Sequence, residues 1–443
     1  MGIFGLFGGK KNEVDEEALK VQEFENKREK EIADARKAHE QLEWPTIPRL
    51  NPVNIKDAEV SQMDETVSPE RKSEVGQLIY EPEISIDALV DLSGQELLFL
   101  LTAMEVFNKT APLPEFEKNH RKVYNEVLGR IRDAKDLFVL YDMSTGYPYI
   151  DHGFANVYFE EELAQKAKAL FEGQYRKLVV RKVKVENDEA PTGVRRGFFD
   201  YLFYIGIENL IVDNGAYRAR FKRNEIVVSP MDWNGEKKDA SPVNPELNFA
   251  MIDFLEELRW PVSYEKRAEV LKAKEMRMLS LIRNANFIVP MQHEGPVEVL
   301  EDGRMRMGKD TKLKFLVMKT KDDKQFLPIY TDAIEFSKKL NGSEWNAAVF
   351  KYQDILKFVQ DKEGIRINPN GQSIVMPKDR MMAIEIAGQQ AQIMRAKAGV
   401  KKEAPKSTAS MSEEAAVQAA LNQAMAKMNE KRETEDFKEP ENQ

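Results

Sequence analysis

Cysteine is absent from all 443 residues of the chain. Its absence excludes disulfide bonds, thiolate metal ligands and cysteine nucleophiles, and it fits a reducing compartment. Histidine is scarce as well: only four occur, and no two of them have the spacing that places two imidazoles on one metal ion. We therefore expect no metal site and no cofactor. The histidines are His39, His120, His152 and His293.

Long apolar runs are also missing. The longest, Leu97 to Met104 and Phe198 to Ile207, fall well short of the roughly 20 residues that cross a bilayer. Residues 1–11 place their apolar side chains before the lysines, which is the reverse of a signal peptide. We expect a cytoplasmic protein of bacterial type without stable membrane insertion. Weak contact of the apolar start with an anionic lipid surface is an alternative to an unstructured start.

The sequence has neither an excess of positive charge nor a nucleotide-binding motif. The net charge is −9, so nucleic acid is not an expected partner. No glycine-rich phosphate loop or nucleophile elbow lies between a strand and a helix. The one Asp-His pair, Asp151-His152, lies near Tyr147 and Tyr149, but a turn ending at Gly153 explains it better than catalysis. We expect the chain not to be an enzyme.

What is present is a repeated order of elements. A helix ending at Asp133-Ala134 runs into the strand Leu137 to Tyr141, and a helix ending at Asn284-Ala285 runs into the strand Phe287 to Val289. Each copy then continues with a strand and an amphipathic helix, the latter over Glu160 to Phe171 in the first copy and Asp332 to Leu340 in the second. The pattern predicts an α+β fold with two tandem, diverged copies of one module, built of short antiparallel strands with packed helices.

Both copies close alike. Gly206-Ile207 and Gly364-Ile365 open the closing segments, and Asn214-Gly215 and Asn370-Gly371 end them. Asn-Gly favours a hairpin turn because both residues tolerate positive φ. Turn chemistry therefore explains these residues better than ligand contact does.

The ends of the chain differ from its centre in composition. Residues 14–42 predict a solvated charged helix, and prolines from Pro45 to about Glu74 indicate a linker. Residues 412–432 predict a second helix whose small apolar stripe suits a groove in another protein, a solvated tail being the alternative. The expected divisions are an N-terminal helix and linker over 1–75, a first module over 76–230, a connecting segment over 231–265, a second module over 266–385 and a C-terminal linker and amphipathic helix over 386–443.

Three segments of the second copy resemble a known family. They are the strand Phe287-Ile288-Val289-Pro290, the junction Phe326 to Asp332, and the turn Gly364 to Gly371, which reads Gly-Ile-Arg-Ile-Asn-Pro-Asn-Gly. Together they are similar to the SseB family over about residues 269–384, and the first copy matches only by pattern. The family's usual aromatic residue is replaced at Asn370, and Tyr330 stands where phenylalanine is usual. The resemblance implies a small binding or regulatory domain without an established biochemical activity.

The expected function follows from these features. We expect a non-enzymatic SseB-like adaptor protein that contacts unidentified protein partners; the alternative is a metabolite-sensing regulator with a ligand cleft between the two modules. Arg218 and Arg220 form a basic cluster that suits phosphate or an acidic peptide, although a solvated strand face explains them at least as well. The candidate binding surface comprises Tyr330, Asp332, Asn368, Pro369, Asn370, Arg218 and Arg220.

Overall fold

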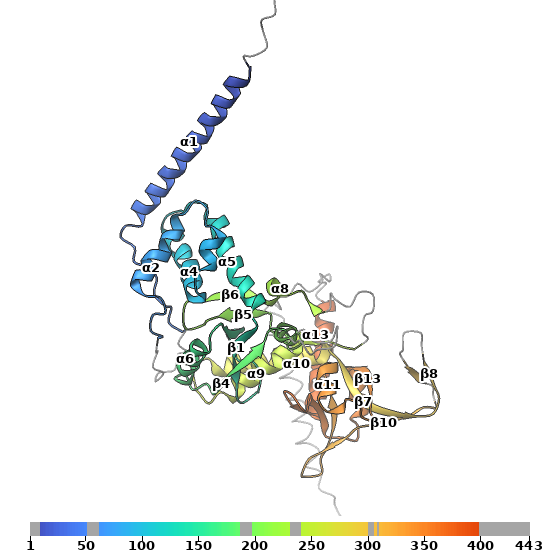
Figure 1. Cartoon of the computed structure of the whole chain (residues 1–443). Helices are drawn as coiled ribbons and strands as arrows, with labels where there is room; N and C mark the ends of the chain where they lie inside the picture. Colours follow the sequence, from blue (N-terminus) through green and yellow to red (C-terminus); the bar gives the residue numbers. More distant parts are fainter. Residues whose placement is uncertain are drawn as a thin grey trace, which may run out of the picture.

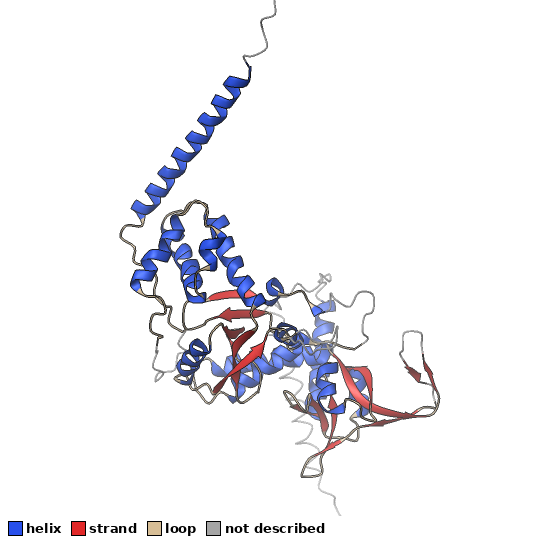
Figure 2. Ribbon diagram, in the orientation of Figure 1, coloured by secondary structure: helices blue, strands red, loops and turns tan. Residues whose placement is uncertain are grey.

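The computed structural model describes residues 9–50, 62–186, 197–230, 241–299, 305–307 and 310–397. Helices and strands are mixed, as the expected α+β class requires (Figure 1, Figure 2). The buried apolar side chains form two separate clusters, which we call the first core and the second core. Within the described residues, no helix is both long and apolar enough to cross a membrane.

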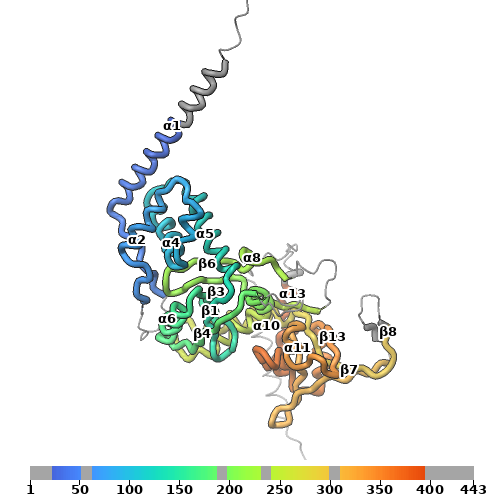
Figure 3. Tube along the Cα trace, in the orientation of Figure 1, coloured from blue at the N-terminus to red at the C-terminus, as the bar shows by residue number. Residues whose placement is uncertain are grey.

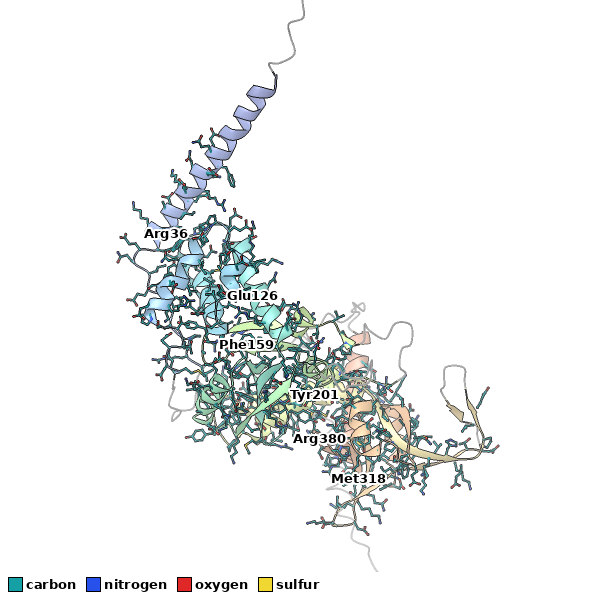
Figure 4. All side chains as sticks on the ribbon, in the orientation of Figure 1. Arg36, Glu126, Phe159, Tyr201, Met318 and Arg380 are labelled. Atoms are coloured by element: carbon teal, nitrogen blue, oxygen red, sulfur yellow. The ribbon has the colours of Figure 1, made fainter. Side chains whose placement is uncertain are left out.

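The predicted N-terminal helix is present as α1 (Gly9–Ala38), which extends from the body like a rod (Figure 1). Its last turn meets the body near Arg36 (Figure 4), whose guanidinium lies 4.3 Å from the centre of the Tyr80 ring. His39 is buried just after the helix, and its Nδ1 lies 3.1 Å from the Tyr80 hydroxyl. The charged rod is thus attached to the first core at its C-terminal end.

The predicted linker from Pro45 to about Glu74 is wrong in its described residues. Ile47 is buried, and the Pro45 carbonyl accepts hydrogen bonds from both Lys72 and the Tyr217 hydroxyl. Helix α2 (Pro69–Gly76) begins within this segment. The prolines prevent a regular helix or strand, so the sequence of this segment lacks the periodicity of one and resembles a linker. Its apolar side chains can nevertheless face the core.

The first core lies around a six-stranded sheet with the order β4-β1-β3-β5-β6, to which β2 adds by pairing with β3. Strands β3 and β5 are parallel, and the other neighbours are antiparallel. The strands are β1 (Asp136–Asp142), β2 (Ile150–Asp151), β3 (Phe154–Tyr158), β4 (Leu178–Lys184), β5 (Asn209–Val212) and β6 (Ala219–Lys222). The remaining helical segments here are η1 (Gln77–Tyr80), α3 (Ile86–Val90), α4 (Gly94–Thr110), α5 (Phe116–Asp133), α6 (Glu161–Glu172), α7 (Phe198–Tyr204) and α8 (Arg223–Ile226).

The second core contains strands of the orders β10-β7-β13 and β11-β12-β14-β15. An antiparallel bridge between Ile288 and Tyr330 joins β7 to the end of β12, and we call the combined set the second sheet. Its strands are β7 (Asn286–Glu294), β10 (Lys312–Phe315), β11 (Met318–Lys319), β12 (Gln325–Ile329), β13 (Asn346–Lys351), β14 (Gly364–Ile367) and β15 (Ile374–Pro377), and β8 (Val297–Val299) pairs with β9 (Met305–Met307) on an arm (Figure 1). The helices are α9 (Pro245–Arg259), α10 (Arg267–Asn284), α11 (Ala333–Leu340), α12 (Tyr352–Phe358) and α13 (Lys378–Lys397).

The two sheets share one strand order. The path β13-β7-β12-β14-β15 repeats β4-β1-β3-β5-β6, including the parallel pair β12 and β14 in the place of β3 and β5. This order agrees with the repeat in the sequence. That the two copies arose from one module stays a prediction.

Helix α9 shows that the described part of the predicted connecting segment, from residue 241 to 265, is more than a connection. Leu247 and Met251 belong to the second core, whereas Ile252 belongs to the first. In Figure 3, helix α10 lies between the strands of the first sheet and those of the second. Helix α13 also continues to Lys397, past the predicted end of the second module at residue 385. The predicted helix over 412–432 lies outside the described residues.

Candidate functional site

A buried polar cluster of the second sheet lies where its two parallel strands end. Ile329 of β12 pairs with Ile367 of β14, and Asn368 follows directly. The Asn368 backbone N–H donates to the Ile329 carbonyl at 2.9 Å, and its Oδ1 accepts the Thr331 N–H at 2.9 Å. Asn368 has φ 46°, a left-handed conformation that asparagine tolerates better than most residues. The side chain therefore closes the open end of the strand pair.

Asn248 of α9 connects this strand end to the rest of the molecule. Its Oδ1 accepts from the Thr331 hydroxyl at 2.9 Å and from Asn368 Nδ2 at 3.3 Å. Its Nδ2 donates to Asp332 Oδ2 at 3.0 Å and to the Tyr204 carbonyl of α7 at 2.9 Å. One buried amide thus connects α7 to the strand ends of the second sheet.

The structure corrects the expected binding surface at three positions. Tyr330, Asp332 and Asn368 are 3%, 3% and 0% exposed, so they present no surface to a partner. Asp332 instead caps α11, because its Oδ1 accepts the Glu335 N–H at 2.9 Å. Polar residues that follow a strand are often exposed, but here α9 and the β14–β15 turn cover them. Pro369 is half-buried and Asn370 is exposed at the same turn.

A contact between the first and second parts of the chain lies beside this cluster. Tyr147 donates a long hydrogen bond of 3.5 Å to Glu335 Oε1, which also accepts from Lys338 at 2.6 Å. Glu335 Oε2 is buried without a hydrogen-bond partner, and burial raises the pKa of the Glu335 carboxyl. A Cβ added at Gly371 would lie 2.5 Å from that oxygen, so a larger residue here would require the Glu335 carboxyl to shift.

Helix α13 carries an exposed apolar row on the face opposite its buried one. Met382, Ile386 and Ile393 are 45%, 38% and 54% exposed, and their spacing of four and seven residues aligns them on one side. We call these three residues the α13 stripe. The buried face includes Met381, Ala383, Ile384, Ala387 and Ala391.

Family comparison identifies the part of the chain that contains these features. Residues 265–383 match the SseB protein N-terminal domain. These residues are thus similar to an SseB N-terminal domain, and for that similarity we call them the SseB domain. No curated protein and no solved structure matched the chain.

The family match covers the second sheet and the start of the α13 stripe, and it does not extend to the first sheet. The site of the SseB domain nevertheless has a counterpart in the first sheet. Asp213 follows β5 as Asn368 follows β14, and it is fully buried. Its Oδ2 accepts from Gln95 Nε2 at 2.7 Å, and its Oδ1 accepts the Phe159 N–H at 3.1 Å. Burial raises the pKa of Asp213 to about 7, against the opposing effect of these two hydrogen bonds.

Arg218 and Arg220 lie in the first part of the chain, on and beside β6, and not at the SseB-domain strand ends. Arg218 is half-buried and donates to Asn214 Oδ1 at 2.6 Å. Arg220 is exposed, with its guanidinium 5.3 Å from the centre of the Phe154 ring. The expected surface is therefore divided between the two sheets.

The turn interpretation of Asp151-His152 is confirmed. His152 and Gly153 have φ of 49° and 90° and connect β2 to β3, as a two-residue hairpin requires. His152 Nδ1 lies 2.9 Å from Asp151 Oδ1, which raises the pKa of the imidazole. Among the described side chains, no group of three carboxylates or imidazoles could hold a metal ion.

Sequence reasoning missed both Asn248 and the α13 stripe. Asn248 lies on a helix that was taken for a connection, and nothing in its local sequence sets it apart. The stripe had a readable signal, since apolar residues at 382, 386 and 393 alternate with alanines at 383, 387 and 391. A helix with two apolar faces indicates one face for its own core and one for a partner.

Proposed function

We propose that this chain is a non-enzymatic adaptor protein of the bacterial cytoplasm, which binds other proteins through the α13 stripe at the end of its SseB domain. The observation that carries the proposal is the exposure of Met382, Ile386 and Ile393 in one row. An apolar row of this width and spacing suits the apolar face of an amphipathic helix. The partner is therefore expected to supply a helix with apolar residues three and four positions apart.

The stripe is presented by a firmly held helix. Arg283 of α10 forms a two-pronged ion pair with Glu385, through hydrogen bonds of 3.1 and 3.2 Å. A Cβ at Gly388 would lie 2.1 Å from Arg283 Nε, so glycine permits this approach. The Tyr352 hydroxyl donates to the Met381 carbonyl at 2.9 Å. A rigid platform lowers the entropy lost on binding.

The proposal is tested by affinity capture from a bacterial lysate with three forms of the full chain: wild type, the double variant Met382→Asp/Ile393→Asp, and Gln392→Asp. Gln392 is exposed on α13 but lies off the stripe, so Gln392→Asp is a matched control. Proteins bound by wild type and control but lost by the double variant support the proposal. Capture of nothing, or of the same proteins by all three forms, contradicts it, provided that circular dichroism shows equal folding.

A metabolite sensor is a second candidate, favoured by two buried carboxylate oxygens. Glu335 Oε2, at the contact with Tyr147, and Glu256 Oε1 have no hydrogen-bond partner. Glu256 Oε2 accepts the Ile150 N–H at 3.0 Å, so α9 joins the first sheet here. A small ligand with a hydrogen-bond donor would satisfy such a buried oxygen. A saturable rise in Tm with an amine metabolite, lost in Glu335→Gln, would favour this candidate over the adaptor.

A further inference from the structure

We propose that the chain's own residues 412–432 dock on the α13 stripe as an antiparallel helix and cover it until a partner displaces them. The inference rests on the proposed adaptor function and names an intramolecular competitor for the same surface. Residues 398–443 follow α13 directly and lie outside the described residues. The occupant is therefore tethered to the surface that it would cover.

The spacing of apolar residues in the two segments is the first argument. On α13, Met382, Ile386 and Ile393, with Gln389 between the last two, are separated by four, three and four residues. In the tail the same separations relate four small or apolar residues. Two helices with this repeat pack their rows against each other in a coiled-coil manner. The tail residues are Val417, Leu421, Ala424 and Met428.

An antiparallel register aligns both rows over their full length. Met382 then faces Met428, and Ile393 faces Val417, because both rows span the same number of residues. Ile386 faces Ala424, so a large side chain meets a small one at this level. Gln389 faces Leu421, the one level that pairs a polar side chain with an apolar one.

The chain length and the charges agree with this direction. Residues 398–411 can extend up to about 46 Å, enough to return along the roughly 17 Å of the stripe. The tail segment begins with Glu413 and Glu414, which the antiparallel register places near Lys397 at the end of α13. Its other end adds no preference, because Lys431 and Arg432 would lie near Lys378, Asp379 and Arg380, whose charges do not sum to a negative first turn. A parallel register would place like charges together at the end of α13.

The tether makes even a weak contact sufficient. A short flexible linker gives an effective concentration in the millimolar range, so a tail with modest intrinsic affinity covers the stripe most of the time. A protein partner must then bind more tightly than the tail, which restricts the adaptor to partners with larger apolar residues than the tail's Ala424 and Val417.

The absence of cysteine permits a direct test in the full chain by disulfide trapping. The pair Gln389→Cys/Ala424→Cys places two thiols at neighbouring levels of the docked helices. The control pair Gln389→Cys/Ala416→Cys keeps the same α13 position but moves the tail thiol off its apolar face. Under mild oxidation we expect the first pair to form an intrachain disulfide on the order of ten-fold faster than the control, and Ile393→Asp to remove the difference.

Three results overturn the proposal. Equal rates for both pairs mean that the tail samples the surface without docking. Disulfide-linked dimers in place of intrachain bonds mean that a second copy of the chain occupies the stripe. No disulfide in either pair means that the tail stays away from it. Because the test involves no partner, any of these results leaves the adaptor function standing if stripe-dependent capture succeeds.

Discussion

Asp213 and Asn368 occupy equivalent positions at the ends of the two parallel strand pairs. Each backbone N–H donates to a carbonyl of the neighbouring strand, at 2.8 and 2.9 Å. Each Oδ1 accepts the N–H two residues further along that strand, at 3.1 and 2.9 Å. Each has a positive φ, 54° and 46°. The same local structure is thus closed by a carboxyl in one sheet and by an amide in the other.

The second side-chain atom explains the choice of residue. Asp213 Oδ2 meets a donor, the Nε2 of Gln95, at 2.7 Å. Asn368 Nδ2 meets acceptors, the Thr331 hydroxyl at 2.9 Å and Gln372 Oε1 at 2.8 Å. The carboxyl and the amide are therefore not interchangeable, although they differ by one atom.

Asn368→Asp is expected to destabilise the SseB domain by about 3 kcal/mol at pH 8, because it places a buried carboxylate against acceptor oxygens. Urea unfolding followed by circular dichroism measures the change. Asn370→Asp is the matched control on the same turn, and its exposed side chain predicts a change within about 0.5 kcal/mol. Equal effects of the two variants would show that the buried network contributes little.

Asp213 is expected to make stability depend on pH. Its pKa rises from the ordinary 3.8 to about 7 on burial, so the native state holds a proton that the unfolded state releases between these values. The free energy of unfolding should therefore fall as pH rises from about 4 to about 7, and level off above that. Asp213→Asn removes this pH-dependent contribution. Its amide N–H group would face the donor Gln95 Nε2, and this lowers the free energy of unfolding by the same amount at every pH.

The measurement is the difference in unfolding free energy between wild type and Asp213→Asn at pH 5 and at pH 8. Wild type should lose stability relative to the variant as pH rises, so the advantage of wild type shrinks or reverses. The same difference at both values would mean that Asp213 keeps its ordinary pKa.

Much of the fold was predictable where a short apolar pattern is enough to specify a helix or a strand. The strands β1 and β7, the helices that precede them and the strand pairs that end each copy follow from apolar runs. The closing turns differ from the expectation, because positive φ occurs at Asn368 and Ser373 and not at Asn370 or Gly371. The segment around Ile47 was not, because its contacts are with distant residues such as Lys72 and Tyr217. The same holds for α9, whose role as a shared helix depends on how the two cores meet.

The candidate site was only partly predictable, and the equivalence of the closing glycines was wrong. Gly206 and Gly364 were expected to occupy equivalent positions in the two copies. The strand registers show instead that the equivalent of Gly364 is Asn209, since each begins the strand pair that closes its copy. Gly206 instead follows α7 with φ 75°, where a Cβ would lie 2.0 Å from the Pro245 carbonyl oxygen. The expected equivalence rested on residue type alone, and it placed the first copy three residues out of register with the second.

Gly364→Ala is expected to destabilise the second sheet by about 3 kcal/mol or more. A Cβ at this position would lie 2.1 Å from the Met376 carbonyl oxygen, and φ is 151°. Gly342→Ala is the control, since its φ is 68° but no atom lies within 4 Å of the added Cβ, and about 1 kcal/mol is expected from backbone strain alone. Thermal unfolding of both variants compares them, and similar losses would show that β15 moves away at little cost.

Asn248→Ala tests whether α9 couples the two cores. Leu247 and Ile252 lie in different cores, so we expect wild type to unfold in one calorimetric transition. Removing the Asn248 amide leaves Thr331, Asp332 and the Tyr204 carbonyl without these hydrogen bonds, at a cost of about 3 kcal/mol. The SseB domain should then unfold first, as a separate or broadened transition.

Glu246→Ala is the control for this variant, because Glu246 is exposed on the same helix. It should keep a single transition at nearly the wild-type Tm. If Asn248→Ala also melts as one unit with an unchanged Tm, the coupling comes from the apolar contacts of α9 and not from its buried amide. Two transitions already in the wild type would mean that the cores unfold independently, and that α9 belongs to one of them in energy although it packs against both.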